Sequence, residues 1–430
     1  MDNTISSFPL PTAPKKKRQQ NIIKVKEVPS AIKTTEEIEQ ERKFSDFARS
    51  RRIELSRKYS EKRRNSDLPT PAAGSRVQTV VKDPIIEGKA NLKLLSQLDV
   101  DQLCAQYNQD CTMFASGGAD GIVRLFNAFN GDLVKTLKGG KEVEGQTSCV
   151  TCIKVKPLGK SEPNDNLITC SYVNGVIKCF NYQTNQCLYT IKEKRQTYGL
   201  TFHPKLSKFI SYGDDLKIYL YDIETQAKER VFQGSIYRDV HDGPTSRVFA
   251  GRFNPASSTE FLTGGWDATI LLWDLRHPHA IRYISGVHLC GEGLDVTSGG
   301  RQVLTCSWRT EDPLQIWDYS TFKLIDSLSP DSHYSKLYCG RYISPEYISC
   351  GGGYPSIFRV LDTSVYKTRA SVTGLPADVF HLCVGKPSRS APPPKKNKFE
   401  DENDNALPDL SYEPRILFAA GVRVYEINFL

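Results

Sequence analysis

The amino-acid sequence predicts an all-β fold in which seven small sheets of similar design stack radially into a ring. Three observations lead to this prediction. The stretch "FLTGGWDATILLWDLR" (Phe261–Arg276) has the pattern of two apolar strands joined by a tight turn and ended by Trp-Asp. Six further stretches share this form, at separations of 41 to 64 residues. A unit of three or four short strands cannot bury both of its faces alone, so repeated units must pack on one another.

Each of the seven copies consists of a strand, a turn of small residues and a second strand. The second strand ends in an aromatic residue or Leu, followed by Asp, Asn or Glu. The copies cover Phe114–Asn127, Ile168–Asn181, Ile210–Asp222, Phe261–Arg276, Leu304–Asp318, Ile348–Asp362 and Phe418–Glu426. Radial stacking buries each sheet on its neighbours and leaves only short edges. Residues 90–430 are therefore expected to form one body.

The seventh copy lacks an outer strand, because the sequence ends at Leu430, five residues after Tyr425. An unpaired strand edge would leave the ring open. The segment 90–98, "ANLKLLSQL", is apolar, precedes the first copy and has no sheet of its own. We expect it to supply the missing strand. The segment 385–414, rich in Pro, Lys, Asp and Asn, is expected to be a disordered loop between the first two strands of the seventh unit.

The positive charge of the chain is concentrated at its N-terminal end. Residues 1–90 hold 20 Lys and Arg against 12 Asp and Glu, whereas the remaining residues hold 37 of each. The sequence thus predicts a basic extension, residues 1–89, on an electrically balanced body. Most of the extension has the composition of a disordered segment. Within it, residues 35–64 follow a capping box and favour a basic, weakly amphipathic helix.

Two short motifs lie in the extension. A nuclear-import-like run is formed by Lys15, Lys16, Lys17 and Arg18. The alternative for this run is a solvated basic tail. Ser66 follows Arg63-Arg64-Asn65, as in sites of basophilic kinases, and phosphorylation there would cancel part of the positive charge.

Composition also constrains the compartment. No apolar run reaches the length of about 18 residues that a membrane span needs. The N-terminus lacks the apolar core of a signal peptide. The 12 cysteines form no tight framework, and several lie inside apolar runs, as buried thiols do in a reducing compartment. We expect a nuclear or cytoplasmic protein that is not secreted and has no membrane partner.

The repeats resemble those of the WD-repeat family of β-propellers, over roughly residues 90–430. The family signature is clear at Trp273-Asp274 and Trp317-Asp318 and degenerate in the other copies. The resemblance implies a seven-bladed WD-repeat-type β-propeller, here with a disordered or helical basic N-terminal extension. It also implies a non-catalytic scaffold that binds other proteins in a multi-protein complex.

The resemblance further implies a structural hydrogen-bonded tetrad inside the fourth unit. Its members would be His241, Thr263, Asp267 and Trp273. A buried carboxylate is costly unless donors surround it, and a His and the turn amides can donate. Asp267 is therefore interpreted as structural and not as catalytic.

No motif of an enzyme is found in the sequence. The nucleophile elbow, the phosphate-binding loop and the His-Glu-x-x-His zinc motif do not occur. We therefore expect no catalytic residue, no cofactor and no small-molecule substrate. Cys149 and Cys152 have the spacing of half a zinc site, but residues three apart on a strand point to opposite faces. We accordingly expect no metal site.

Aromatic residues recur at the turn after the first strand of the copies. The resemblance places this turn on the face where the central channel opens and where peptides often dock, and aromatic rings are rigid anchors for partners. The alternative is that each ring only covers its own blade. The candidate partner-binding residues are Tyr172, Tyr212, Trp266, Trp308 and Tyr354.

Two other functions compete with the general scaffold. Trp273-Asp274-Leu275-Arg276 resembles the box by which propeller receptors dock the adaptor of a cullin-based ubiquitin ligase, with Arg276 as the planar charged group. Its alternative is a solvated Arg at an ordinary repeat end. The basic segment 15–64 would suit an acidic polymer such as nucleic acid or the tubulin surface. Strand direction in the family places both the extension and the 385–414 loop on the face opposite the aromatic turns.

Overall fold

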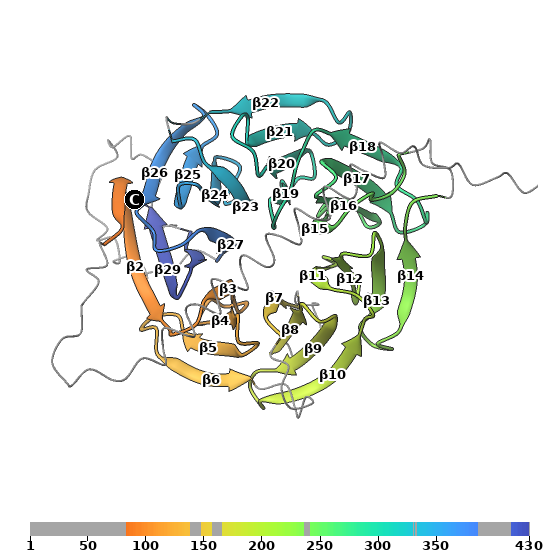
Figure 1. Cartoon of the computed structure of the whole chain (residues 1–430), viewed down its shortest axis with the longest axis horizontal. Helices are drawn as coiled ribbons and strands as arrows, with labels where there is room; N and C mark the ends of the chain where they lie inside the picture. The colour runs from red at the N-terminus through yellow and green to blue at the C-terminus, as the bar shows by residue number, and fades with distance from the viewer. Residues whose placement is uncertain are drawn as a thin grey trace, which may run out of the picture. The chain divides into compact units, whose positions relative to one another are not determined.

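The computed structural model describes residues 83–137, 148–156, 166–235, 241–329, 331, 333–385 and 414–429. The described residues form strands and turns only, and none of them belongs to a helix that could span a membrane. Within the body from Val80 to Leu430, the strands form seven sheets arranged as the blades of a ring (Figure 1). The predicted all-β, seven-bladed propeller is confirmed.

Blades 1 to 4 each contain four antiparallel strands in sequence order, from the innermost to the outermost. Blade 1 consists of β3 (Gln102–Tyr107), β4 (Met113–Gly118), β5 (Val123–Asn127) and β6 (Leu133–Leu137). Blade 2 consists of β7 (Val150–Val155), β8 (Leu167–Tyr172), β9 (Val176–Asn181) and β10 (Gln186–Lys192). Blade 3 consists of β11 (Thr197–Phe202), β12 (Lys208–Gly213), β13 (Ile218–Asp222) and β14 (Lys228–Phe232). Blade 4 consists of β15 (Val248–Phe253), β16 (Glu260–Gly265), β17 (Thr269–Asp274) and β18 (Arg282–Ser285).

Blade 5 follows the same plan, whereas blades 6 and 7 depart from it at the closure of the ring. Blade 5 consists of β19 (Leu294–Val296), β20 (Gln302–Cys306), β21 (Leu314–Asp318) and β22 (Leu324–Leu328). Blade 6 consists of β23 (Lys336–Tyr342), β24 (Tyr347–Gly353), β25 (Ile357–Asp362), β26 (Lys367–Thr373) and β1 (Ile85–Gly88). Blade 7 consists of β27 (Val379–Val384), β28 (Ile416–Ala420), β29 (Arg423–Phe429) and, as its outer strand, β2 (Ala90–Gln97).

The aromatic residue that ends each repeat has a packing role inside its blade. Trp273 pairs across the sheet with Phe261, and the two buried rings stack with centroids 6.0 Å apart. The same cross-strand stacking joins Phe114 to Phe126 at 5.0 Å. Such pairs combine large apolar burial with a favourable ring geometry. Blades 3 and 7 have aromatic pairs at the same place, whereas in blades 2, 5 and 6 the partner of the terminal residue is Ile or Val. The residue that ends each repeat therefore marks one apolar cross-strand pair per blade.

The ring closes where the first strands of the body meet the last. β2 pairs with β29 along its whole length, from Ala90 opposite Phe429 to Gln97 opposite Arg423. The side chain of Leu95 is only 5% exposed and belongs to the hydrophobic cluster between blades 7 and 1. The outer edge of β29 is thus covered, which removes an unpaired strand from the body.

One strand of the closure was not predicted. β1 adds a fifth strand to blade 6 by pairing with β26, so the β1–β2 segment holds blades 6 and 7 together. Gly88, at the end of β1, has φ +88°. A Cβ at this position would lie 2.1 Å from the carbonyl oxygen of Arg369, so only glycine fits the turn.

Strand direction defines two faces of the propeller. At one face, each first strand begins and each second strand connects to the third strand. We call this face the turn face and the other one the opposite face. Ile85 of β1 pairs with Thr373, where the fourth strand of blade 6 ends at the turn face. The chain described from residue 83 therefore enters the body at the turn face. The predicted entry from the opposite face holds for Ala90, which pairs with Phe429 there, but not for Ile85, because β1 precedes β2 and runs in the other direction.

The closure leads to a prediction about truncation. A chain that lacks residues 1–89 should stay folded and melt within a few degrees of the full chain, because it loses only the exposed edge strand β1. A chain that lacks residues 1–98 should aggregate or melt at least about 10 °C lower, because β29 becomes an unpaired apolar edge. Circular dichroism melts and gel filtration of both proteins measure this. Equal melting temperatures would show that β2 does not close the ring.

Candidate functional site

The turn face carries a chain of aromatic side chains around the mouth of the central channel, the space enclosed by the seven first strands. Three of them, Trp266, His288 and Trp308, come from connections in blades 4 and 5. The others lie near the start of first strands. We call the following set the aromatic arc: Tyr198, Phe249, Trp266, His288, Trp308, Tyr338 and Phe380. Centroids of neighbouring rings lie 4.5–6.5 Å apart, so the arc is continuous from blade 3 to blade 7.

A repeated irregularity of the first strands positions four of these rings. In six blades the pairing between the first and second strands skips one residue near the turn face. A residue at such a bulge has no partner across the sheet, and its side chain is re-aimed. The skipped residues are Leu103, Thr151, Tyr198, Phe249, Tyr338 and Phe380. Because blades 3, 4, 6 and 7 place an aromatic residue there, the bulges build most of the arc.

The arc is accessible as well as continuous. Trp266 is 41% exposed and Phe380 39%, and the other members are partly buried. The ammonium group of Lys336 lies 4.0 Å from the ring centroid of Trp308 and 6.0 Å from that of Tyr354. Lys336 thereby links the arc to Tyr354, which is 70% exposed. Large exposed rings next to a cation form a surface that can hold a peptide by apolar contact, stacking and cation–π attraction.

The predictions for Tyr172 and Tyr212 as surface anchors are wrong. Tyr172 is 4% exposed and Tyr212 only 1%. Both belong to second strands, β8 and β12, where side chains point between blades, whereas Trp266 and Trp308 follow the ends of β16 and β20. The ring of Tyr212 fills the gap between blades 3 and 4. A Cβ at Gly199 or at Gly251 would lie 2.6 Å from that ring, so two glycines make room for it.

Blade 4 contains part of the predicted tetrad. The indole nitrogen Nε1 of Trp273 donates to Thr263 Oγ1 at 2.8 Å, and both residues are buried. Asp267 accepts from the backbone amides of Thr245 at 2.9 Å and Thr269 at 3.2 Å. The prediction for His241 is wrong, because its side chain is exposed and its ring lies beside Tyr283, at 5.4 Å between centroids. The turn amides take the place of the imidazole as donors to Asp267.

Blade 3 builds a comparable network from residues that the sequence analysis did not single out. Glu193 is buried and accepts from the hydroxyl groups of Thr197, Ser211 and Tyr221. Arg195 lies 2.8 Å from the carboxylate of Glu193, which neutralises the buried charge. The only sequence signal was a pair of charged residues just before a first strand, and such pairs are usually solvated.

Below the arc, the channel is crossed by an ion network centred on Glu292. Glu292 in blade 5 is the structural equivalent of Phe249 in blade 4. Leu294 lies two residues after Glu292 and pairs with Thr305, just as Gly251 lies two residues after Phe249 and pairs with the equivalent Thr263. Its Oε2 atom lies 2.6 Å from Lys154 Nζ of blade 2 and 2.5 Å from Arg341 Nη2 of blade 6. One carboxylate thus connects three blades through the centre of the ring.

His381 of blade 7 completes this network. Its Nδ1 accepts from the amide of Ala105 at 3.4 Å, and its Nε2 lies 3.5 Å from Glu292 Oε2, which fits a neutral imidazole. Burial lowers the pKa of His381 below its ordinary value, although Glu292 opposes the change. For Glu292, burial would raise the pKa, but Lys154, His381 and Arg341 together hold that pKa well below its usual range. The site is therefore a fixed carboxylate among cations.

The network ends above a cavity on the opposite face. This cavity has a volume of about 250 Å³ and is lined by Lys154, Arg252, Asp295 and Arg341, among others. Asp295 and Arg252 form an ion pair at 2.8 Å. Charged side chains therefore occupy the centre of the ring from Glu292 to the opposite face, whereas the turn face is aromatic.

The remaining candidate residues lie elsewhere. Arg276 follows the third strand of blade 4, so it is at the opposite face, with 72% of its side chain exposed. Its guanidinium nitrogens contact Asp274 at 2.9 and 2.6 Å. Hydrogen bonds from Arg276 outweigh burial and lower the pKa of Asp274 to about 2. The predictions for Lys15, Lys16, Lys17, Arg18, Ser66, the helix at 35–64 and most of the 385–414 loop lie outside the described residues.

The cysteine pair does not have the surroundings of a metal site. Cys152 is buried and its sulfur lies 3.2 Å from Glu292 Oε1. Burial raises the pKa of the Cys152 thiol to about 12 and also raises that of Cys149, so both stay protonated near neutral pH. Among the residues that the structure describes, no three His, Cys, Asp or Glu side chains gather so that they could hold a metal ion.

Comparison with known proteins supports the repeat architecture. The family model "WD domain, G-beta repeat" matches residues 96–127 and 236–274, in blades 1 and 4. Cilia- and flagella-associated protein 52 of Bos taurus is 27% identical over 165 residues, 38% of this chain and 23% of that protein. Cleavage stimulation factor subunit 50 of Arabidopsis thaliana is 25% identical over 211 residues, 46% of each chain. The striatin homolog of Dictyostelium discoideum is 22% identical over 288 residues, 61% of this chain and 32% of that protein.

The matches with these relatives are partial. In each case the aligned part spans less than half the length of the relative. The names of the relatives also point to different cellular processes. What they have in common is the repeat, and the similarity to this chain is limited to it.

The central network leads to a prediction about stability. Glu292→Gln should lower the free energy of unfolding at pH 7 by about 3–5 kcal/mol, because Lys154 and Arg341 would lose the carboxylate that neutralises them. The pKa of Glu292 is lower in the folded than in the unfolded protein. Its contribution is therefore present above the unfolded pKa of about 4.3 and is lost as the pH falls further.

Urea unfolding from pH 7 to pH 3.5 measures this effect. The difference between wild type and Glu292→Gln should be constant above about pH 5.5 and should shrink below about pH 4. Glu224→Gln is a suitable control, because Glu224 is exposed on the opposite face and should change stability by less than about 0.5 kcal/mol. A pH-independent difference, or equal effects of the two substitutions, would contradict the ion network.

Proposed function

Because the chain belongs to the WD-repeat family of β-propellers, we propose that it is a non-catalytic scaffold that binds segments of partner proteins at the aromatic arc. The observation that carries this proposal is the continuity of the arc, seven rings from five blades around one channel mouth. Aromatic side chains bury much area at a small entropic cost, which is why they dominate protein interfaces.

The arc is suited to an extended segment more than to a compact surface. The network around Glu292 fills the channel below it, so a ligand lies across the mouth rather than passing through. Tyr338 and Phe380 belong to first strands of adjacent blades, with centroids 4.9 Å apart, so the two rings are in contact and form one continuous apolar surface. Apolar side chains of a partner would pack on this surface, while Lys336 would favour an acidic or aromatic neighbour.

A binding role also agrees with the chemistry of the described residues. The two acid–base groups in the central channel, Glu292 and His381, are engaged with other side chains: His381 is buried, and the carboxylate of Glu292, only 13% exposed, contacts Lys154, Arg341 and His381. A catalytic group would need access to substrate. We propose that the partners belong to a multi-protein complex in the nucleus or the cytoplasm. The names of the relatives do not identify that complex.

The two competing functions stay predictions. The ubiquitin-ligase adaptor box would use Arg276, whose guanidinium is already paired with Asp274. Attachment to an acidic polymer would use residues 15–64, which lie outside the described residues. The arc is favoured over both because its residues are accessible and lack a competing role.

The proposal predicts the effect of removing two rings. Trp266→Ala combined with Trp308→Ala should reduce the recovery of a defined set of partners by at least about tenfold, since loss of each central aromatic anchor costs about 1–2 kcal/mol or more. Quantitative affinity purification from the native cell measures this. Tyr283→Ala is the matched control, because Tyr283 is 47% exposed but lies on the outer strand β18.

Three outcomes separate the proposal from its alternatives. A partner set that survives Tyr283→Ala and disappears with the double variant would support the arc. An unchanged partner set, with the double variant still folded by circular dichroism, would overturn it. A set lost only with Arg276→Ala would favour the adaptor box instead.

A further inference from the structure

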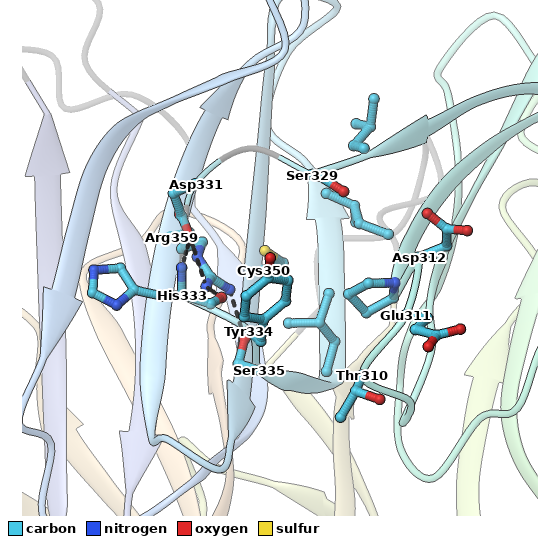
Figure 2. Close-up of a pocket in the computed structure, with 14 residues that line it drawn as sticks. Thr310, Glu311, Asp312, Ser329, Asp331, His333, Tyr334, Ser335, Cys350 and Arg359 are labelled. Carbon is cyan, nitrogen blue, oxygen red and sulfur yellow. Dashed lines mark hydrogen bonds and ion pairs between the residues drawn. The ribbon is translucent and has the colours of Figure 1, made fainter.

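A second cavity, this one on the turn face, lies between blades 5 and 6 and away from the channel mouth. Its volume is about 510 Å³, within the range of sites that hold a small ligand or a peptide side chain. Three parts of the chain line it, as Figure 2 shows: the turn between β20 and β21, the connection between β22 and β23, and residues of β24 and β25. We call it the blade 5–6 pocket.

The floor of the blade 5–6 pocket is apolar and rigid. Leu314, Leu328 and Leu337 line it, and each is at most 2% exposed to solvent. These residues belong to the hydrophobic cluster between the two blades, so the floor is part of the core and exists without a ligand. Because these three side chains expose so little surface, an apolar group that enters the pocket would gain its burial from the walls and rim of the cavity more than from the floor.

One wall of the pocket is fixed by a neutral ion pair. Arg359, only 4% exposed, contacts Asp331 at 2.7 and 3.0 Å and donates to Ser335 Oγ at 2.6 Å and to the carbonyl of His333. Asp331 also accepts from Thr368 at 2.6 Å. Figure 2 shows the bonds among Arg359, Asp331, His333 and Ser335 on one side of the cavity. The wall is preorganised and contributes no net charge.

The rim on the other side carries free negative charge. Glu311 and Asp312 are exposed in the turn between β20 and β21, and Figure 2 places them across the cavity from Arg359. Within the described ranges, neither carboxylate has an ion-pair partner. The mouth also presents Tyr334, which is 74% exposed. The guanidinium of Arg309 donates to the backbone carbonyl of Asp312 at 3.1 and 2.9 Å, so residues 309–312 carry one net negative charge. The pocket thus combines an apolar floor with a net acidic rim and an aromatic ring.

We propose that the blade 5–6 pocket binds a basic peptide segment of a partner protein, in which a large apolar residue lies within three positions of Lys or Arg. The apolar side chain occupies the cavity above the leucine floor, and the cationic group reaches Glu311 and Asp312, with Tyr334 available for stacking. Because the Arg359–Asp331 pair of the wall is neutral, the charge of the rim determines which charge the ligand must carry. A phosphate-rich ligand such as nucleic acid would meet the two carboxylates, whereas the guanidinium of Arg309 in the same turn is bonded to the carbonyls of Asp312 and Gly286.

This site differs from the aromatic arc in its cavity and in its chemistry, so the two can be tested separately. The arc offers rings and Lys336, which suits aromatic or acidic residues, whereas the pocket offers carboxylates over an apolar floor. The chain would hold two segments at once on the turn face. The proposal shares with the proposed function only the premise that the propeller binds peptides.

The test begins with random dodecapeptides displayed on phage and selected on the full chain. Peptides enriched for the apolar-plus-basic pattern are synthesised with a fluorescent label, and their affinity is measured by anisotropy. Glu311→Lys combined with Asp312→Lys should weaken these peptides by at least about tenfold, because attraction at the rim becomes repulsion. Raising the salt concentration should weaken binding to the wild-type chain.

Matched variants make the result specific. Glu224→Lys combined with Glu346→Lys changes the charge equally at two exposed residues of the opposite face and should leave the affinity within about twofold. Ser329→Trp, at an exposed position of the pocket lining, should block the floor and abolish binding. Trp266→Ala should have no effect on these peptides, so that a failure of the arc and a failure of the pocket are distinguishable.

Several outcomes would overturn the proposal. The first is that the selection yields acidic peptides, or none with the expected pattern. The second is that the two double charge reversals weaken peptide affinity equally. The third is that the peptides bind Ser329→Trp as tightly as the wild-type chain. Tighter binding of a single-stranded oligonucleotide than of the selected peptides would also overturn it.

Discussion

The seven blades have no hydrophobic core in common, so the ring is stable only if every blade has a neighbour on both sides. The pairing of β2 with β29 provides this condition, because it completes blade 7 with a strand from the other end of the body. β1 extends the closure onto blade 6, and Gly88 allows the tight reversal between the two strands. The position of each side chain around the channel depends on this closed geometry, since first strands face one axis only when the ring is complete.

In the closed ring, the bulges of the first strands together form the aromatic arc. A bulge near the start of a first strand re-aims one side chain, and repetition of the bulge around the axis brings these side chains together. In blade 5 the same register position holds Glu292, which faces Lys154 and Arg341 instead of joining the rings. One structural position therefore yields both the aromatic mouth and the ionic centre, according to the residue type that occupies it.

The faces of the propeller differ in their chemistry as a result. The turn face offers apolar and aromatic surface, with the carboxylates Glu311 and Asp312 beside a separate pocket. The opposite face offers the charged cavity around Arg252 and Asp295 and the Asp274–Arg276 pair. β1 begins at the turn face, so the first described residues of the chain lie on the side of the body that carries the arc.

Local pattern in the sequence was sufficient for the architecture. The recurring strand, turn and terminal aromatic residue determined seven blades, because each signal arises within about fifteen residues and reflects cross-strand pairs such as Phe261 with Trp273. The apolar segment 90–98, without a sheet of its own, was sufficient to predict a strand there. The repeats also pointed to Trp266 and Trp308, which follow their strands directly and are therefore free to reach the surface.

Tertiary structure alone decided which polar and aromatic residues meet. Tyr212 is buried because Gly199 and Gly251, from two different blades, leave space for its ring, and no local signal reveals that fit. Tyr198, Phe249, Tyr338 and Phe380 form the arc only through bulges, and an aromatic residue at the start of a strand is by itself an ordinary core signal. Glu292 meets Lys154, Arg341 and His381 from three other blades. Such contacts span the ring axis, and sequence periodicity describes blades one at a time.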